Sequence, residues 1–141
     1  MLGDKFATRI NSFALMPEIF WPNKKQISTV DLINRASTVK GLTDIDLNYP
    51  DHIQNNHKEI INCVNDKGLN INGFAMRYYN NLKFRIGAFT NPDKKIRQEA
   101  IDMTKKGIDS VRESGAKLMT IWLGQDGFDY SFQADYKKLW Q

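Results

Sequence analysis

Cysteine, histidine and long apolar runs are scarce in this chain of 141 residues, and each scarcity excludes a class of protein. The single cysteine, Cys63, excludes an intramolecular disulfide framework and a metal cluster built from cysteines alone. No apolar run approaches the roughly 18 residues that are needed to span a bilayer, and no secretory signal is visible at the N-terminus. We therefore expect a cytoplasmic protein that has no membrane partner.

The chain carries a net charge of +4, which raises the question of nucleic-acid binding. Many of its basic side chains fall on one predicted helix, where acidic residues interleave with them: Lys94, Lys95, Arg97, Lys105, Lys106 and Arg112 alternate with Asp93, Glu99, Asp102, Asp109 and Glu113. This alternation is typical of a solvated helix face rather than of a stripe that binds phosphates. We expect no nucleic-acid partner.

Strand and helix patterns alternate four times along the chain. The strands are expected at residues 6–15, 41–47, 69–76 and 117–123, each followed by a helical pattern, at 28–37, 56–66, 91–114 and from 132. Ser28 is the predicted N-cap of the first helix. Gly73, inside the third strand, predicts a close approach of another backbone. The fourth strand is almost continuously apolar, which predicts that both of its faces are covered.

The third predicted helix has the clearest boundaries. Asn91 stands as its expected N-cap, and Pro92 occupies the expected first helical position. Apolar residues recur along it at intervals of three to five and predict its buried stripe: Ile96, Ala100, Met103, Ile108 and Val111.

This order of elements predicts a single α/β domain over residues 1–141, with a parallel sheet and right-handed crossovers. Two architectures fit: an open doubly wound sheet, and the N-terminal half of a (β/α)8 barrel, which needs about 250 residues when complete. Nucleotide-binding open sheets carry a glycine-rich turn after the first strand, whereas this chain has Pro17, Glu18, Trp21 and Pro22 there. Polar clusters follow the second, third and fourth strands, at the end where a barrel places its active site.

Two stretches resemble a known family. They are LTDIDLNYP at residues 42–50 and WLGQDGFDY at residues 122–130, the second followed by FQADY at 132–136. The sequence resembles the xylose-isomerase-like TIM-barrel superfamily, and most of all its sugar isomerases, in which a W-x-G-Q-D-G-x-D-Y-x-F-Q-x-D-Y stretch follows the fourth strand. The resemblance implies a barrel in which a divalent metal, Mn, Mg, Co or Zn, polarises sugar oxygens as a Lewis acid.

The same resemblance implies that this chain is incomplete. In that superfamily the metal-binding residues come mainly from strands five to eight, and the expected elements here stop after the fourth strand and its helix. We therefore expect a (β/α)4 half-barrel that is truncated relative to the family, with no metal ligands of its own and too little of the site for catalysis alone.

The candidate substrate-binding residues lie at or just after the ends of the second, third and fourth predicted strands: Trp122, Gln125, Asp126, Asp46, Asn48, Arg77 and His52. Trp122 is either an apolar wall against a sugar ring or a core residue. Gln125 and Asp126 either bind sugar hydroxyls or satisfy the backbone of a glycine-rich turn.

The remaining candidates also have two interpretations each. Asp46 and Asn48 alternate along one strand and share a face, as site residues or as a hydrogen-bonded strand end. Arg77 could hold a phosphate or a sugar hydroxyl, or could form a salt bridge with Asp46. His52, in the following loop, is either part of the site or a surface histidine.

Two functions follow as hypotheses. The first is the N-terminal part of a metal-dependent sugar isomerase or epimerase, with a sugar or sugar derivative as its ligand. The second is a non-catalytic half-barrel remnant or carbohydrate-binding module, which the lack of a two-histidine-plus-carboxylate set favours for the chain in isolation.

The open edges of the first and fourth strands predict a homodimer or higher oligomer. The ends of strands three and four lack histidine, which argues against the endonuclease branch of the superfamily.

Overall fold

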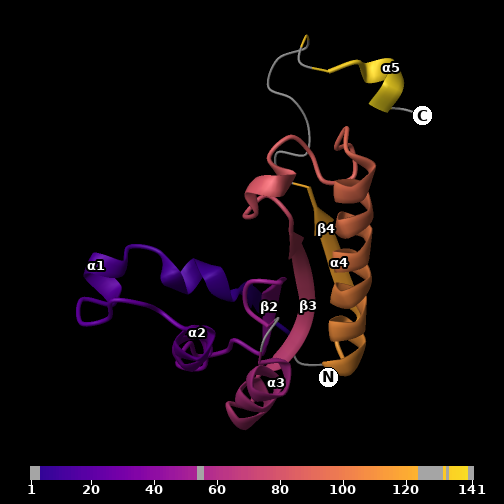
Figure 1. Cartoon of the computed structure of the whole chain (residues 1–141). Helices are drawn as coiled ribbons and strands as arrows, with labels where there is room; N and C mark the ends of the chain where they lie inside the picture. The colour runs from indigo at the N-terminus through magenta and orange to yellow at the C-terminus, as the bar shows by residue number, and fades with distance from the viewer. Residues whose placement is uncertain (1–3, 54–55, 124–131, 133, 140–141) are drawn as a thin grey trace.

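Four parallel strands form one sheet in the order β1-β2-β3-β4 in a computed structural model of the chain, which describes residues 4–53, 56–123, 132 and 134–139 (Figure 1). The strands are β1 (Ala7–Arg9), β2 (Asp44–Tyr49), β3 (Asn70–Arg77) and β4 (Leu118–Trp122). The helices are α1 (Pro17–Phe20), α2 (Thr29–Ala36), α3 (His57–Asp66), α4 (Lys94–Glu113) and α5 (Tyr136–Leu139), with 3-10 turns η1 (Ile10–Ala14) and η2 (Leu82–Phe84). The predicted α/β class is confirmed, and consecutive strands of a barrel follow the same order.

One face of the sheet carries the hydrophobic core. The apolar residues that alternate along the two central strands are buried there against α2, α3 and α4: Ile45, Leu47, Tyr49, Phe74 and Met76 pack in one cluster with Ile33, Ile60 and Ala100. Right-handed crossovers between neighbouring parallel strands place all connecting helices on the same side, so the opposite face receives no helix from them. Figure 1 shows α4 running alongside β3 and β4.

Local sequence determines the ends of α2 and α3. Ser28 is the N-cap of α2, as predicted, because its side chain accepts from the Asp31 N–H at 3.2 Å while the Asp31 carboxylate accepts from the Ser28 N–H at 3.0 Å. This reciprocal pair satisfies two backbone donors that the first helical turn leaves free. Gly68 follows α3 with a φ of 69°, the left-handed conformation that ends a helix.

The start of α4 differs from the prediction. Asp93, rather than Asn91, is the N-cap, and its carboxylate accepts from the Lys95 N–H at 2.8 Å. Asn91 is buried, and its Nδ2 donates to the Gly87 carbonyl at 2.8 Å. Its Oδ1 accepts from the Asp93 N–H at 3.0 Å, in a turn that precedes the helix, so Pro92 lies outside α4 and the first helical turn is capped two residues later.

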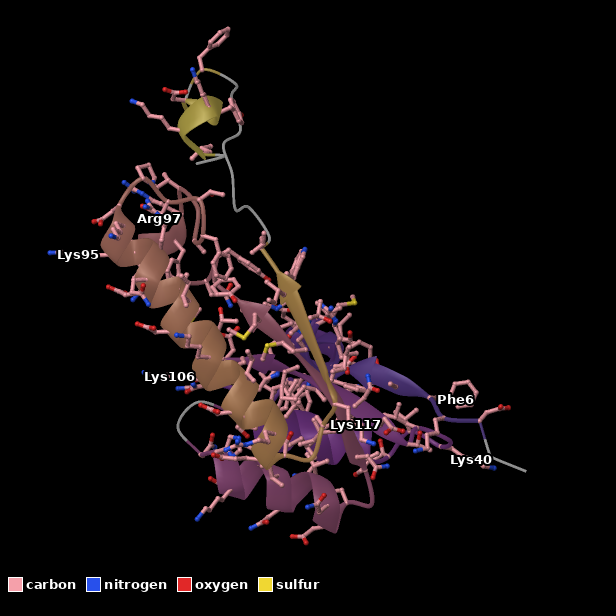
Figure 2. The ribbon with its side chains drawn as sticks, turned by 90° about the vertical axis from the view of Figure 1, so that its right-hand side faces the viewer. Phe6, Lys40, Lys95, Arg97, Lys106 and Lys117 are labelled. Carbon is pink, nitrogen blue, oxygen red and sulfur yellow. The ribbon has the colours of Figure 1, made fainter. Side chains whose placement is uncertain are left out.

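The predicted buried stripe of α4 is confirmed at Ala100, which is buried, and at Ile96, Met103 and Val111, which are partly buried against the core; it is wrong at Ile108. Small side chains face the sheet, at Ala100, Thr104, Gly107 and Ser110, whereas Ile108 is 53% exposed. A Cβ on Gly107 would lie 2.6 Å from Met76 Sδ, so the helix lies close to the strands. The basic residues form the opposite, solvated face as expected, and Figure 2 shows Lys95 and Lys106 extending away from the sheet.

Two predictions about the outer strands, the length of the first and the coverage of the fourth, are wrong. β1 contains only three residues, because Ile10 turns into the core and the Leu15 N–H closes a turn on the Ser12 carbonyl at 3.4 Å. β4 is not covered on both faces: Leu118 and Ile121, on opposite sides of the strand, are 51% and 52% exposed. Within the described residues β4 is an edge strand of the sheet.

Among the helices of the described residues, none is long and apolar enough to cross a membrane.

Candidate functional site

The sheet brings four of the predicted site residues to one face, which we call the polar face: Asp46, Asn48, Arg77 and Trp122. Alternation along each strand and the register between strands together produce this arrangement. Arg77 pairs with Trp122, and Asn48 pairs with Ala75, which is buried but lies outside the hydrophobic core cluster. The polar face is therefore the face opposite the core.

Arg77 is the centre of an aromatic group at the carboxyl end of β3. Its guanidinium carbon lies 4.3 Å from the centre of the Trp122 ring and 5.6 Å from that of Tyr79. The two rings meet edge to face, with centroids 5.3 Å apart. Arg77 Nη1 also donates to the Tyr79 hydroxyl at 2.8 Å. Cation–π attraction and this hydrogen bond fix the guanidinium in place.

His52 is bound to the end of β2 by two hydrogen bonds. After the cis peptide between Tyr49 and Pro50, the His52 N–H donates to the Asn48 carbonyl at 2.9 Å, and the Asn48 N–H donates to His52 Nδ1 at 2.9 Å. An imidazole whose Nδ1 accepts carries its proton on Nε2. His52 is thus a partly buried part of the strand end rather than a surface histidine, and its Nε2–H is a neutral donor.

The protonation states around Arg77 follow from burial and charge. Burial, reinforced by the positive charge of Arg77, lowers the pKa of His52 from 6.5 to about 4, so the imidazole is neutral at pH 7. Burial raises the pKa of the Asp51 carboxyl, an effect that the hydrogen bond from Asn80 and the charge of Arg77 oppose. Asn80 Nδ2 donates to Asp51 Oδ2 at 2.6 Å and joins the loops that follow β2 and β3.

Sequence reasoning did not identify Tyr79, Asp51 or Asn80. Tyr79 had a usable signal, because a residue two positions beyond Arg77 continues on the same side of an extended chain. Asp51 and Asn80 had none, because they are 29 residues apart and meet only once the two strands pair.

The other predicted residues lie apart from this group. Asp46 is nearer the middle of β2, and its Oδ1 accepts from Asn72 Nδ2 at 2.8 Å. The alternative salt bridge between Arg77 and Asp46 is not formed: among the described side chains, Arg77 makes no ion pair. Gln125 and Asp126 lie outside the described residues.

The described side chains do not fit a divalent metal. No group of three or more histidine, cysteine, aspartate or glutamate residues lies close enough together there to hold an ion. At the site, Asp51 Oδ2 accepts a hydrogen bond from the Asn80 amide, and His52 Nδ1 accepts one from the Asn48 N–H. Both acceptors are thus already used. The other histidine, His57 at the start of α3, is partly buried, with its Nδ1 3.2 Å from Glu113 Oε2 at the end of α4.

Comparison with known proteins gives one distant similarity. No family model matches the chain. A stretch of 78 residues, 55% of this chain, is 26% identical to xylose isomerase from Thermus thermophilus, and it covers 20% of that protein. The chain thus spans about a fifth of the length of this relative. The resemblance to xylose isomerase is confirmed as distant and partial, the four parallel strands are consistent with part of a TIM barrel, and a relation to sugar isomerases is suggested.

Proposed function

We propose that this chain binds a sugar at the carboxyl ends of β2, β3 and β4, as the N-terminal part of a sugar isomerase or epimerase. The observation that carries the proposal is the half-exposed Trp122 ring, which stands beside Arg77 at the strand ends. A sugar ring has an apolar C–H face that packs on an aromatic ring, and hydroxyls that bond to polar groups around it. The neutral Nε2–H of His52 is one such donor. The similarity to xylose isomerase supports the same ligand class.

The alternative function is a non-catalytic carbohydrate-binding module. The chemistry of the described site favours it for the chain in isolation, because a guanidinium, a neutral imidazole and a tryptophan ring are binding groups. An aldose–ketose interconversion assay on the purified 141-residue chain with added Mn²⁺ separates the two functions. Turnover would reject the module; sugar binding without turnover would support it. The cytoplasmic location stays a prediction.

Replacing Trp122 tests the binding site directly. We expect Trp122→Ala to weaken the binding of D-xylose by about tenfold, because the ring supplies the apolar platform at the strand ends. Isothermal titration calorimetry measures the affinity. Ile108→Ala is the control, since Ile108 is similarly exposed but lies on α4, outside the proposed site. Equal affinities for the Trp122 variant and the unaltered chain would contradict the proposed site.

The expected homodimer also becomes a proposal, in which the β4 edge pairs with a second copy of the chain. Its support is an edge strand that leaves backbone groups unpaired and exposes Leu118 and Ile121 on its two sides. Light scattering at micromolar concentration should give twice the chain mass. Ile121→Lys should shift the population to monomer, since a lysine on an edge strand blocks pairing. A stable, well-dispersed monomer of the unaltered chain would count against this interface.

A further inference from the structure

Arg77 is a buried cation that has no carboxylate partner among the described residues. Its side chain and backbone together are 5% exposed, and its Nε has no hydrogen-bond partner. A buried charge is stable only when other groups replace the water that it has lost. The two aromatic rings and the Tyr79 hydroxyl replace part of that water, but they supply no negative charge.

The free edge of the guanidinium has the geometry of an oxyanion site. Nη1 is engaged by the Tyr79 hydroxyl, which leaves Nε and Nη2, the two nitrogens on the other edge, without a described partner. Their parallel N–H groups match the spacing of two oxygens in a carboxylate or phosphate. Such bidentate pairs are stronger than bonds to a neutral hydroxyl.

The neighbouring groups leave this positive charge largely uncompensated. The nearest histidine is His52, which is neutral at pH 7 because its pKa is lowered to about 4. The charge of Arg77 acts on the carboxylate of Asp51, where it opposes the rise in pKa that burial causes. Asp51 nevertheless forms no ion pair with Arg77, and its Oδ2 accepts a hydrogen bond from Asn80 Nδ2.

We propose that Arg77 binds an oxyanion of the substrate through Nε and Nη2, so that the sugar of this site is an acidic one, a sugar phosphate or a sugar acid. The proposal rests on the proposed sugar-binding function and names the substrate class of the same site. Trp122 and Tyr79 position the guanidinium, and the sugar ring lies beyond it along the polar face. Nε is covered in the structure, so binding includes a rotation of the Arg77 side chain that exchanges the Nη1 bond to the Tyr79 hydroxyl for bonds from Nε and Nη2 to the anion.

The test compares charged and neutral ligands of one configuration. The affinities of the full chain for D-glucose, D-glucose 6-phosphate, D-glucuronate and inorganic phosphate are measured by calorimetry. We expect at least one charged sugar to bind tenfold or more tightly than D-glucose, and the phosphate and carboxylate arms identify which oxyanion fits. The Arg77 Nε–H resonance, assigned by its loss in Arg77→Lys, should shift when that ligand is added.

Arg77→Lys should reduce the preference for the charged sugar by about tenfold, because an ammonium keeps the charge but loses the bidentate edge. Arg85→Lys, at an exposed position after η2, is the matched control and should keep the preference. If circular dichroism shows that Arg77→Lys does not fold, Tyr79→Phe tests the same site, because it frees Nη1 and leaves the charge of Arg77 in place. This variant should change the affinity for the charged sugar and leave the affinity for D-glucose unchanged.

The outcomes distinguish this inference from the proposed function. Equal binding of charged and neutral sugars would overturn the oxyanion site and leave sugar binding standing. An unchanged preference in Arg77→Lys would overturn the role of Arg77. Binding of inorganic phosphate without any sugar, charged or neutral, would reject the proposed function itself.

Discussion

Gly73→Ala is expected to lower the free energy of unfolding by about 1–3 kcal/mol, the range found when atoms are forced into a packed interior. A Cβ at this position would lie 2.7 Å from the Leu118 carbonyl oxygen and 2.9 Å from Leu118 Cβ. Both atoms are fixed by the pairing of Gly73 with Leu118 between β3 and β4, so neither can move without shifting a strand. Urea denaturation followed by circular dichroism measures the change.

Gly107→Ala is the matched control for this prediction. The atoms nearest to its added Cβ are Met76 Sδ at 2.6 Å and Met119 Cε at 3.0 Å, which belong to flexible side chains. Replacing glycine by alanine inside a helix also gains up to about 1 kcal/mol of intrinsic stability. We therefore expect a smaller loss than for Gly73→Ala. A Gly73 variant as stable as the unaltered chain, or a larger loss at Gly107, would contradict the close approach of β4 to β3.

Features that depend on neighbours in sequence were predictable. The Ser28 cap was correct, because it rests on hydrogen bonds between residues only three apart. The start of α4 was wrong although its motif was stronger, because the Asn91 side chain is buried and bonds to the preceding Gly87 carbonyl and to the following Asp93 N–H, while Asp93 caps the helix. The stripe of α4 failed only at Ile108: small residues occupy the most buried positions where the helix lies close to the sheet, and Ile96, Met103 and Val111 pack partly buried beside them.

The candidate site was likewise predictable where it depends on the pattern within one strand, and not where it depends on the pairing of two strands. Alternation correctly placed Asp46 and Asn48 on one face, and the position of Arg77 and Trp122 at strand ends indicated the same edge of the sheet. The register that sets Arg77 opposite Trp122 is decided by the packing of β3 on β4, where Gly73 permits the close approach, and sequence spacing does not give it. Gly73 was nevertheless recognised as a position of close approach.

Acid is expected to destabilise the chain through His52, by about 3 kcal/mol between pH 6.5 and pH 4. The folded-state pKa is lowered from 6.5 to about 4 by burial and by the charge of Arg77. In that window the unfolded chain binds a proton that the folded chain does not, so stability is fully present above pH 6.5 and is lost as the pH falls toward 4. Urea denaturation at a series of pH values measures the slope.

His52→Asn isolates this contribution, because the asparagine oxygen can accept from the Asn48 N–H as Nδ1 does, without titrating. The variant should lose most of the dependence on pH between 6.5 and 4, whatever its stability at pH 7. Asp51 acts in the opposite direction: its raised pKa gives stability that is present below its ordinary value of 3.8 and lost as the pH rises through the folded value. Because Asp51 is unchanged in both proteins, the difference between their curves reports His52 alone. Parallel curves for the variant and the unaltered chain would show that His52 is not buried as a neutral group, and the neutral donor assigned to the sugar site would then be wrong.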